Sequence, residues 1–373
     1  MKVLILYASY GGGHQKAAEA LKEYYEKYHP DYELMYLDAM KYTSPDLNDF
    51  ILKFYVQLST NTPKAWGRLY DLSDQYTSLT DFTTLLSKAV ARKFLKLVAD
   101  FNPDIVICTH PFAIDMLGML KKRKKINPKI GLILTDYAPH QIWISNPNII
   151  DAYFVATDIM EEELRKASID EDKIFVTGIP TLEAFHQKHN REKILEEFDL
   201  NDNTFTILFF PGGEYGLAKN SSTFEDILRL PNVQVITIAG KNEKLKKSFE
   251  KIAKNYSKKV VVLGYTNKVP DILDLADLVI TKPGGLTTTE SIVSITPIVI
   301  TAPIPGQEEH NSNYILNNGL GFRLFNNVDK FLTLKHIISN KKRLEQVKEM
   351  QKLLAKPHAA KDICEIMVNL KKE

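Results

Sequence analysis

The segment between Lys282 and Glu290 combines glycines, a lysine and a carboxylate in the way that a phosphate-binding turn does. Residues 278–280 predict a short strand, Pro283-Gly284-Gly285 ends it, and residues 286–294 predict a helix. The first turn of a helix has unpaired N–H groups and a partial positive charge, so it can bind a phosphate or diphosphate without a metal ion. Lys282 could add a positive charge, and Glu290 could accept hydrogen bonds from the two hydroxyls of a ribose. The alternative is that the glycines only turn the chain and both charged side chains are solvated.

A glycine loop that ends in a histidine follows the first apolar run of the chain. Residues 3–8 predict a buried parallel strand, and Gly11-Gly12-Gly13-His14 then opens an amphipathic helix that extends to Tyr28. The His14 imidazole can act as a general base near neutral pH, and the glycines let a substrate approach the backbone. The dinucleotide-binding fingerprint is absent, because Lys16 stands where its third glycine is needed. By residue type alone, a single histidine at a helix start is more often a surface residue.

The chain alternates apolar runs with helical patterns along most of its length. Such alternation indicates parallel sheets with right-handed crossovers. At 373 residues the chain is too long for one ordinary core and suits two domains. The further runs that predict strands are residues 104–109, 129–135, 152–156 and 174–176 in the first half, and residues 206–210, 234–239, 260–263 and 298–301 in the second.

Polar side chains follow several of these predicted strands. His110 follows the second strand of the first half, and Asp136 and His140 follow the third. Because ligands bind at the carboxyl ends of parallel strands, we expect these side chains and His14 to line one edge of a sheet. Asp136 could there orient an imidazole or balance its charge. Each of them alone could also be structural.

The composition is that of a soluble globular protein, with 44% hydrophobic and 25% charged residues. No apolar run approaches the roughly 18 to 20 residues that a membrane-spanning helix needs. The first strand begins at once, without the longer apolar stretch and cleavage site of a signal peptide, so we expect a cytoplasmic location. Cys108 and Cys364 are the only cysteines, which excludes a disulfide framework and a Cys-based zinc site.

Two basic features stand out against a net charge of only +2. Residues 121–125 read KKRKK with no acid among them, a pattern that favours contact with an anionic surface. Lys88, Arg92 and Lys96 recur every fourth residue in an aromatic-rich helical stretch, residues 43–98. This stretch could lie on a membrane surface, or its basic side chains could extend from a helix packed in the core.

The order of these motifs resembles that of GT-B glycosyltransferases of family 28. The pattern KPGG-x-T-x-TE at residues 282–290, with PGQE at 305–308, is similar to the donor-nucleotide signature of two groups. These are the processive diacylglycerol glucosyltransferases of Gram-positive bacteria and the plant monogalactosyldiacylglycerol synthases. The GGGH that ends at His14 and the TDYAPHQIW of residues 135–143 also resemble motifs of this family, as does Gly178-Ile179-Pro180, which closes its first domain.

The resemblance implies an α/β GT-B fold, with two Rossmann-like parallel-sheet domains, a cleft between them and a C-terminal helix that crosses back to the first domain. We place an acceptor- and membrane-binding domain at residues 1–185, with the helical insert at about 43–98. The nucleotide-sugar domain is placed at residues 186–355. The returning helix is placed at residues 356–373.

The activity implied is inverting transfer of a hexose, glucose by preference, from UDP-glucose or UDP-galactose to diacylglycerol, in one or several rounds. The implied location is the inner face of the cell membrane, on an anionic surface, with no cofactor, no metal and no nucleic-acid partner. The acidic triplet Asp170-Glu171-Asp172 is of the kind that metal-dependent glycosyltransferases use, but it lies in a polar loop and we interpret it as solvated.

The resemblance also assigns residues to roles. It makes His14 the base and Asp136 a second catalytic candidate, and it places His140 and Trp143 on the acceptor side. Glu290 would hold the ribose, while Gln307 and Glu308 would hold the sugar hydroxyls. The full donor side would comprise Gly13, Gly212, Gly213, Lys241, Val269, Lys282, Gly284, Gly285, Thr287, Glu290, Gln307 and Glu308.

Two other functions remain open on the sequence. One is the related enzyme that adds N-acetylglucosamine to the lipid-linked peptidoglycan precursor, although its first loop usually reads GGTGGH. The other is a regulator that senses a UDP-sugar without turnover.

Overall fold

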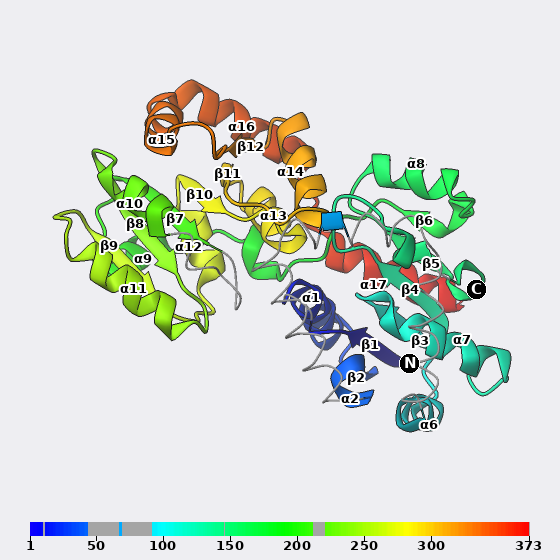
Figure 1. The fold of residues 1–373 in the computed structure, drawn as a ribbon. Helices are drawn as coiled ribbons and strands as arrows, with labels where there is room; N and C mark the ends of the chain where they lie inside the picture. The colour runs from blue at the N-terminus through cyan, green and yellow to red at the C-terminus, as the bar shows by residue number, and fades with distance from the viewer. Residues whose placement is uncertain (10–11, 44–66, 69–91, 145, 212–220, 373) are drawn as a thin grey trace. The chain divides into compact units, whose positions relative to one another are not determined.

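The structure is a computed structural model that describes residues 1–9, 12–43, 67–68, 92–144, 146–211 and 221–372 (Figure 1). The chain divides into two compact units. The first comprises residues 1–182, 304–307 and 356–373, and the second comprises residues 183–303 and 308–355. The predicted helical insert lies almost wholly outside the described residues.

The first unit contains a parallel six-stranded sheet in the order β2-β1-β3-β4-β5-β6. The apolar runs of β1, β3 and β4 are buried, as expected for strands that helices cover on both faces. The strands are β1 (Lys2–Tyr7), β2 (Glu33–Asp38), β3 (Ile105–Cys108), β4 (Lys129–Ile133), β5 (Ala152–Phe154) and β6 (Ile174–Phe175).

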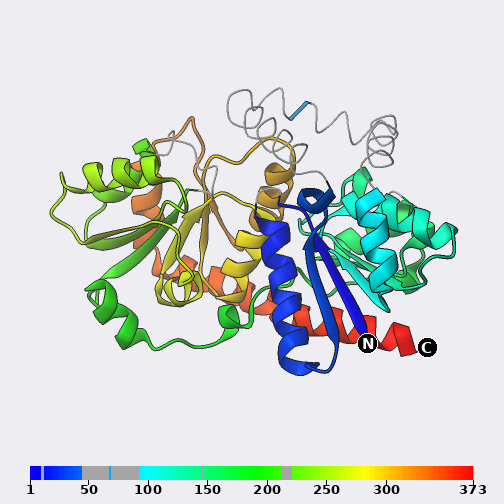
Figure 2. The same cartoon turned by 90° about the horizontal axis from the view of Figure 1, so that it is seen from below.

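Helices and 3-10 turns connect these strands. They are α1 (Gly13–Tyr28), α2 (Ala39–Thr43), α6 (Arg92–Phe101), η1 (Pro111–Ala113), α7 (Ile114–Lys122), η2 (Gln141–Ile144), η3 (Pro147–Ile149), α8 (Asp158–Lys166), η4 (Glu171–Lys173) and, from the end of the chain, α17 (Ala359–Lys372). Helix α17 lies beside α1 in Figures 1 and 2, and its Ile363, Cys364 and Met367 join the core formed by β1, β3 and α1. The first unit is therefore completed by the last helix.

The second unit contains another parallel six-stranded sheet, in the order β12-β11-β10-β7-β8-β9. Its core is formed by the inner faces of β7, β8 and β10 with α10, α11 and α15. The strands are β7 (Phe205–Phe210), β8 (Val233–Ile238), β9 (Val260–Leu263), β10 (Leu278–Thr281), β11 (Ile298–Ile300) and β12 (Gly321–Arg323). The helices are η5 (Glu183–His186), α9 (Arg191–Phe198), α10 (Ser221–Arg229), α11 (Glu243–Ala253), α12 (Val269–Leu275), α13 (Gly285–Val293), α14 (Gln307–Asn317), α15 (Lys330–Ser339) and α16 (Lys341–Leu354).

The predicted fold class is confirmed, while several details differ from the sequence prediction. The strands β2 and β12 were not predicted, and each is the outermost strand of its sheet. The last helix begins at Ala359 and not at residue 356, because Pro357 disfavours the helical conformation of the residue before it. Segment 304–307, which the sequence assigns to the second domain, packs with the first unit.

Candidate functional site

His14 is held at the carboxyl edge of the first sheet by two oxygen atoms. The chain leaves β1, turns at Gly12 with a left-handed φ of 80°, which favours glycine, and enters α1 one residue later. The Nδ1 atom of His14 then lies 2.7 Å from the main-chain oxygen of Thr109 and 2.9 Å from Oγ1 of Thr135. Thr109 also donates its hydroxyl to the carbonyl of His14, at 2.8 Å.

The contact with Thr109 determines the tautomer of His14. A carbonyl oxygen can only accept a hydrogen bond, so Nδ1 carries the proton and Nε2 has the lone pair. His14 is only partly exposed, and desolvation by the surrounding protein lowers its pKa to about 4, against a smaller opposing effect of the bond to Thr109. His14 is therefore neutral at physiological pH, with Nε2 able to accept a proton.

Two further imidazoles follow β3 and β4 and are held in the opposite tautomer. The Nδ1 atom of His110 accepts the N–H of Phe112 at 3.1 Å, and Nδ1 of His140 accepts the N–H of Ile142 at 3.2 Å. Each of these rings, when neutral, carries its proton on Nε2. Burial and the nearby His14 keep the pKa of His110 well below its ordinary value, so this ring is neutral.

The rings of His14, His110 and Trp143 form one cluster. The centroids of His14 and His110 are 4.8 Å apart with the rings nearly perpendicular, and the centroid of Trp143 lies 6.0 Å from that of His14. Trp143 is 7% exposed, so the indole forms part of the wall around the histidines. The structure thus brings His14 and His110 together, as predicted for a shared sheet edge, and adds Trp143 to them.

Asp136, predicted as a catalytic candidate, and Gln307, predicted on the donor side, contact each other. Gln307 belongs to the short segment that packs with the first unit, and its Nε2 donates to Oδ2 of Asp136. Asp136 is only 6% exposed. The two oxygens that bond Nδ1 of His14 belong to Thr109 and Thr135. That Asp136 orients an imidazole therefore stays a prediction.

In the second unit, five of the predicted donor residues lie at or near the start of α13. Gly284 caps this helix, and a Cβ atom added there would meet nothing within 4 Å, so the space beside the turn is open. Lys282 is 9% exposed, and its ammonium has no ion-pair partner among the described residues. A buried cation next to a helix N-terminus favours an anionic ligand. Glu290 is 8% exposed on α13, and Thr287 is partly exposed on the same helix.

The remaining predicted donor residues lie in other parts of the chain. Lys241 follows β8, and its Nζ lies 5.8 Å from the ring centroid of Tyr265, which follows β9 and is 59% exposed. Val269 begins α12, and Glu308 is the second residue of α14. Gly13 begins α1 in the first unit, whereas Gly212 and Gly213 lie outside the described residues.

Sequence reasoning missed the two threonines and an ion pair of the second unit. Thr109 follows β3, which lies next to β1, and Thr135 follows β4, which lies next to β3. Their position just after these strands was the signal available in the sequence. The ion pair joins Arg323 of β12 to Glu309 of α14 through two bonds of 2.6 and 2.8 Å. This pair fixes the first turn of α14, which carries Glu308.

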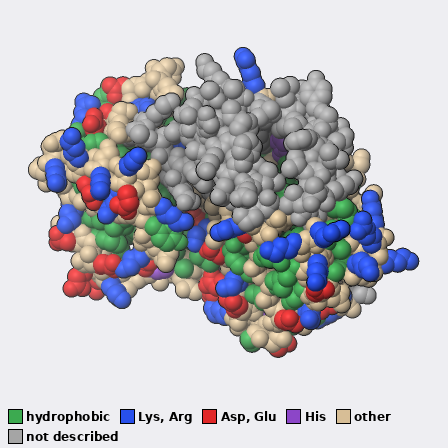
Figure 3. Space-filling view, turned by 60° about the horizontal axis from the view of Figure 1, so that its bottom comes forward, with side chains coloured by type: hydrophobic (Ala, Val, Ile, Leu, Met, Phe, Trp, Pro, Cys, Tyr) green, Lys and Arg blue, Asp and Glu red, His purple; other side chains and the backbone are tan. Residues whose placement is uncertain are grey.

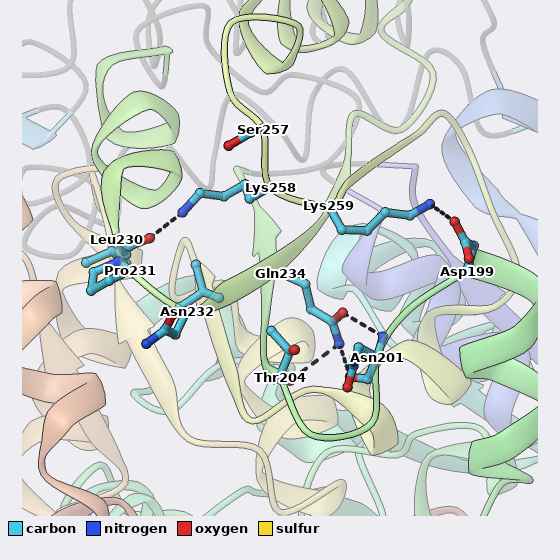
Figure 4. Close-up of a pocket in the computed structure, with 11 residues that line it drawn as sticks. Asp199, Asn201, Thr204, Leu230, Pro231, Asn232, Gln234, Ser257, Lys258 and Lys259 are labelled. Atoms are coloured by element: carbon cyan, nitrogen blue, oxygen red, sulfur yellow. Dashed lines mark hydrogen bonds and ion pairs between the residues drawn. The ribbon is translucent and has the colours of Figure 1, made fainter.

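A cavity of about 420 Å³ lies at the edge of the second sheet where β7, β8 and β9 begin, which is the edge opposite to the start of α13 (Figure 4). Its lysines point apart, Lys258 to the carbonyl of Leu230 and Lys259 to Asp199. Gln234, 2% exposed, bonds to the backbone of the 199–204 segment. Because these polar groups are used within the protein, the cavity belongs to the packing of this segment against the sheet.

Comparisons with known proteins match both units. Residues 14–181 match the sequence model of monogalactosyldiacylglycerol (MGDG) synthase, and residues 144–368 match that of UDP-N-acetylglucosamine 2-epimerase. The processive diacylglycerol beta-glucosyltransferase of Bacillus pumilus is 28% identical over 369 residues, which cover 98% of this chain and 94% of the relative.

Two solved structures have the same fold at low identity. MurG of Acinetobacter baumannii has a TM-score of 0.64 at 13% identity, over 99% of this chain and 100% of its own. The UDP-N-acetylglucosamine 2-epimerase of Neisseria meningitidis, bound to UDP-GlcNAc, has a TM-score of 0.63 at 15% identity over the same shares. These likenesses concern the fold alone, which is GT-B.

Proposed function

Since the chain belongs to the family of monogalactosyldiacylglycerol synthases and processive diacylglycerol glucosyltransferases, we propose that it transfers glucose from UDP-glucose to the hydroxyl of diacylglycerol. The chain is a glycosyltransferase. Its residues 144–368 belong also to the UDP-N-acetylglucosamine 2-epimerase family, which favours a UDP-sugar as donor. Transfer is preferred over epimerisation because the glucosyltransferase relative is 28% identical over 98% of this chain, whereas the solved epimerase is 15% identical.

The observation that carries this proposal is the lone pair on Nε2 of His14, fixed by the Thr109 carbonyl at Nδ1. The acceptor hydroxyl gives its proton to Nε2 while its oxygen forms a bond to the anomeric carbon of the sugar. The bond between that carbon and the diphosphate breaks, and its electron pair leaves with UDP. One displacement inverts the anomeric centre, so an α-linked UDP-sugar gives a β-glucoside.

The start of α13 supplies the charge that the leaving UDP needs. The N–H groups of its first turn and the ammonium of Lys282 would stabilise the diphosphate, which replaces the role of a divalent metal. Glu290 would accept the ribose hydroxyls, and Gln307 and Glu308 would bind the sugar. On this basis we propose that transfer needs no metal and continues in the presence of EDTA.

The test is mass spectrometry of products formed from dioleoylglycerol vesicles and a panel of UDP-sugars, with UDP release measured in parallel. We expect β-glucosyl diacylglycerol from UDP-glucose, undiminished by EDTA and lost in His14→Ala. A second sugar on the product would support processivity. Four outcomes would contradict the proposal: a galactosyl product in its place, transfer only to a polyprenyl diphosphate sugar, inversion of UDP-GlcNAc at C2 without an acceptor, or binding of UDP-sugar without turnover.

A basic face on the first unit supports docking on an anionic membrane. Helices α6 and α7 pack against each other, so basic residues from distant parts of the sequence become neighbours. Figure 3 shows Lys and Arg side chains gathered over this part of the unit. No helix among the described residues is long and apolar enough to span a bilayer. The exposed residues of the basic face are Arg92, Lys93, Lys96, Lys122, Arg123, Lys124 and Lys125.

Charge reversal tests this docking. We expect binding to vesicles with anionic lipid to fall steeply with salt, and to be lost when residues 122–125 of the basic face are changed to Glu. The matched control reverses four exposed lysines on or just after α11 of the second unit, Lys244, Lys247, Lys251 and Lys254. Equal losses in both variants, or none in either, would contradict a specific membrane-docking face.

A further inference from the structure

The two oxygens at Nδ1 of His14 are both uncharged, and they differ in origin. One is the main-chain oxygen of Thr109, which no substitution removes. The other is the side-chain oxygen of Thr135, two residues beyond the end of β4. Because Nδ1 already carries the hydrogen, Oγ1 of Thr135 can only accept it, so the N–H is shared between the two oxygens.

The location of Thr135 makes this contact rigid. Thr135 is 4% exposed, and it follows β4, a strand in the centre of the sheet that is buried except at Lys129. Thr109 follows β3, which pairs directly with both β1 and β4. The imidazole is therefore held by two neighbouring strands of its own unit, on the side of the ring away from Nε2.

We propose that Thr135 is a positioning residue for sugar transfer: with the Thr109 carbonyl, its hydroxyl holds His14 in the Nδ1–H tautomer and stabilises the imidazolium that forms when Nε2 takes the acceptor proton. The proposal rests on the proposed function. Proton uptake at Nε2 puts a positive charge on the ring, which strengthens both bonds at Nδ1. The two oxygens therefore stabilise the transition state more than the ground state, and this difference accelerates the reaction.

Substitution of Thr135 tests the proposed effect of its hydroxyl on the rate of sugar transfer. Thr135→Val keeps the shape and removes the acceptor, and we expect kcat to fall about tenfold to 100-fold, the loss typical of a hydrogen bond to a charged group. The KM values for both substrates should stay unchanged, because the bond strengthens only in the transition state. Thr135→Ser retains an acceptor and should restore most of kcat. An unchanged kcat in Thr135→Val, or equal losses in the Val and Ser variants, would overturn the proposal.

The matched control is Thr177→Val. Thr177 is another buried threonine of the same unit, and its hydroxyl bonds to the carbonyl of Gly178 and not to a histidine. We expect its kcat to equal that of the wild type. Thermal unfolding of all three variants shows whether Thr135→Val is folded. A loss of kcat in Thr177→Val equal to that in Thr135→Val would count against a specific effect on His14.

Nitrogen NMR of the wild-type protein tests the tautomer without substrate. In protein labelled with 15N-histidine, the ring signals of His14, assigned by their loss in His14→Gln, should show a protonated Nδ1 and an unprotonated Nε2 at neutral pH. Thr135→Val should increase the fraction protonated on Nε2, and Thr135→Ser should not. A wild-type ring protonated on Nε2 would overturn the proposal whether or not the protein transfers sugar. An Nδ1–H ring in a protein that transfers no sugar would instead overturn the proposed function.

Discussion

At the scale of single residues, the base that we propose, His14, differs from a histidine paired with a carboxylate. A carboxylate at Nδ1 would favour the imidazolium and raise the pKa of the ring, whereas the two threonine oxygens carry no charge. The burial of His14 then dominates and lowers its pKa to about 4. So weak a base cannot remove the proton of an alcohol in advance, and we infer that proton transfer accompanies formation of the glycosidic bond.

The low pKa of His14 predicts the pH dependence of activity. An exposed histidine, with a pKa of about 6.5, would be half protonated near that pH and would lose activity as the pH falls through it. His14 has a folded-state pKa of about 4, so it stays neutral throughout this range. We expect kcat/KM to change little between about pH 8 and pH 5 and to fall only nearer to pH 4.

The measurement is UDP release at a fixed concentration of detergent-dispersed diacylglycerol, with circular dichroism at each pH to confirm that the protein is folded. The free energy of unfolding should also fall at low pH. The unfolded chain binds a proton at His14 below about pH 6.5 and the folded one does not, so unfolding becomes easier as the pH falls from there toward 4. An acid limb of kcat/KM centred near pH 6.5 would contradict this account of His14.

At the scale of elements, most of the strands that the sequence predicted are buried ones. Residues 104–109 and 129–135 read as continuous apolar runs because helices cover both faces of β3 and β4. Two edge strands, β2 and β12, were missed, whereas the edge strands β6 and β9 were predicted. Most of β2 is only partly buried and its four apolar residues stand between Glu33 and Asp38, while β12 has three residues, one of them a glycine, so both give only a short apolar signal. The order of strands in each sheet likewise depends on pairing between distant residues.

The residues of the site also differ in how clearly the sequence signals them. His14 and Lys282 were found because a histidine and a lysine next to glycines are unusual at strand ends. Thr109 and Thr135 were not found, since threonine is common in strands and gives no signal of its own. Their contact with His14 arises only when three strands align, with Leu6 of β1 opposite Cys108 of β3. The contact between Gln307 and Asp136 was equally hidden, because 171 residues separate them.

One element-scale prediction concerns Gln351, which joins α16 to two loops of the second unit. This side chain is fully buried, and its Nε2 donates to the carbonyls of Thr296 and Leu320 at 2.9 and 3.2 Å. Gln351→Leu leaves both acceptors buried without this donor, which costs about 2 to 4 kcal/mol of unfolding free energy. We expect the melting temperature to fall by roughly 5 to 10 °C.

Differential scanning calorimetry measures this change, and the control is a second glutamine of the same helix. Gln346 is exposed on α16, so Gln346→Leu should leave the melting temperature almost unchanged. The effect of Gln351→Leu is moderated because Oε1 of Gln351 itself has no hydrogen-bond partner among the described residues. Similar melting temperatures for the two variants would mean that the bonds of Gln351 do not stabilise the unit.

At the scale of the whole molecule, the two ends of the chain build one core. Helix α17 packs on α1 and on the sheet of the first unit, as the resemblance implied for a helix that crosses back. Glu365 ties it to α1 by accepting the hydroxyl of Tyr24 at 2.9 Å and by contacting Nε2 of His29 at 2.8 Å. Burial raises the pKa of Glu365, but these two bonds outweigh that effect and hold it below its ordinary value.

This arrangement predicts that the last helix stabilises the first unit and not the second. Met367 is fully buried, and its Sδ lies within 2.8 Å of the place that a Cβ on Gly131 of β4 would take. Met367→Asp puts a charge with no partner into that core, which costs more than about 3 kcal/mol. Leu353→Asp makes a similar change on α16, where the side chain is 73% exposed, and should cost little.

Hydrogen exchange followed by mass spectrometry distinguishes the two units. In Met367→Asp we expect faster exchange of the amides in β1, β3 and β4, because opening of the first unit becomes easier. The amides of β7, β8 and β10 should keep their wild-type rates, since the core of the second unit contains no residue of α17. Faster exchange in both sheets would show that the units unfold together, and the C-terminal helix would then stabilise the whole chain.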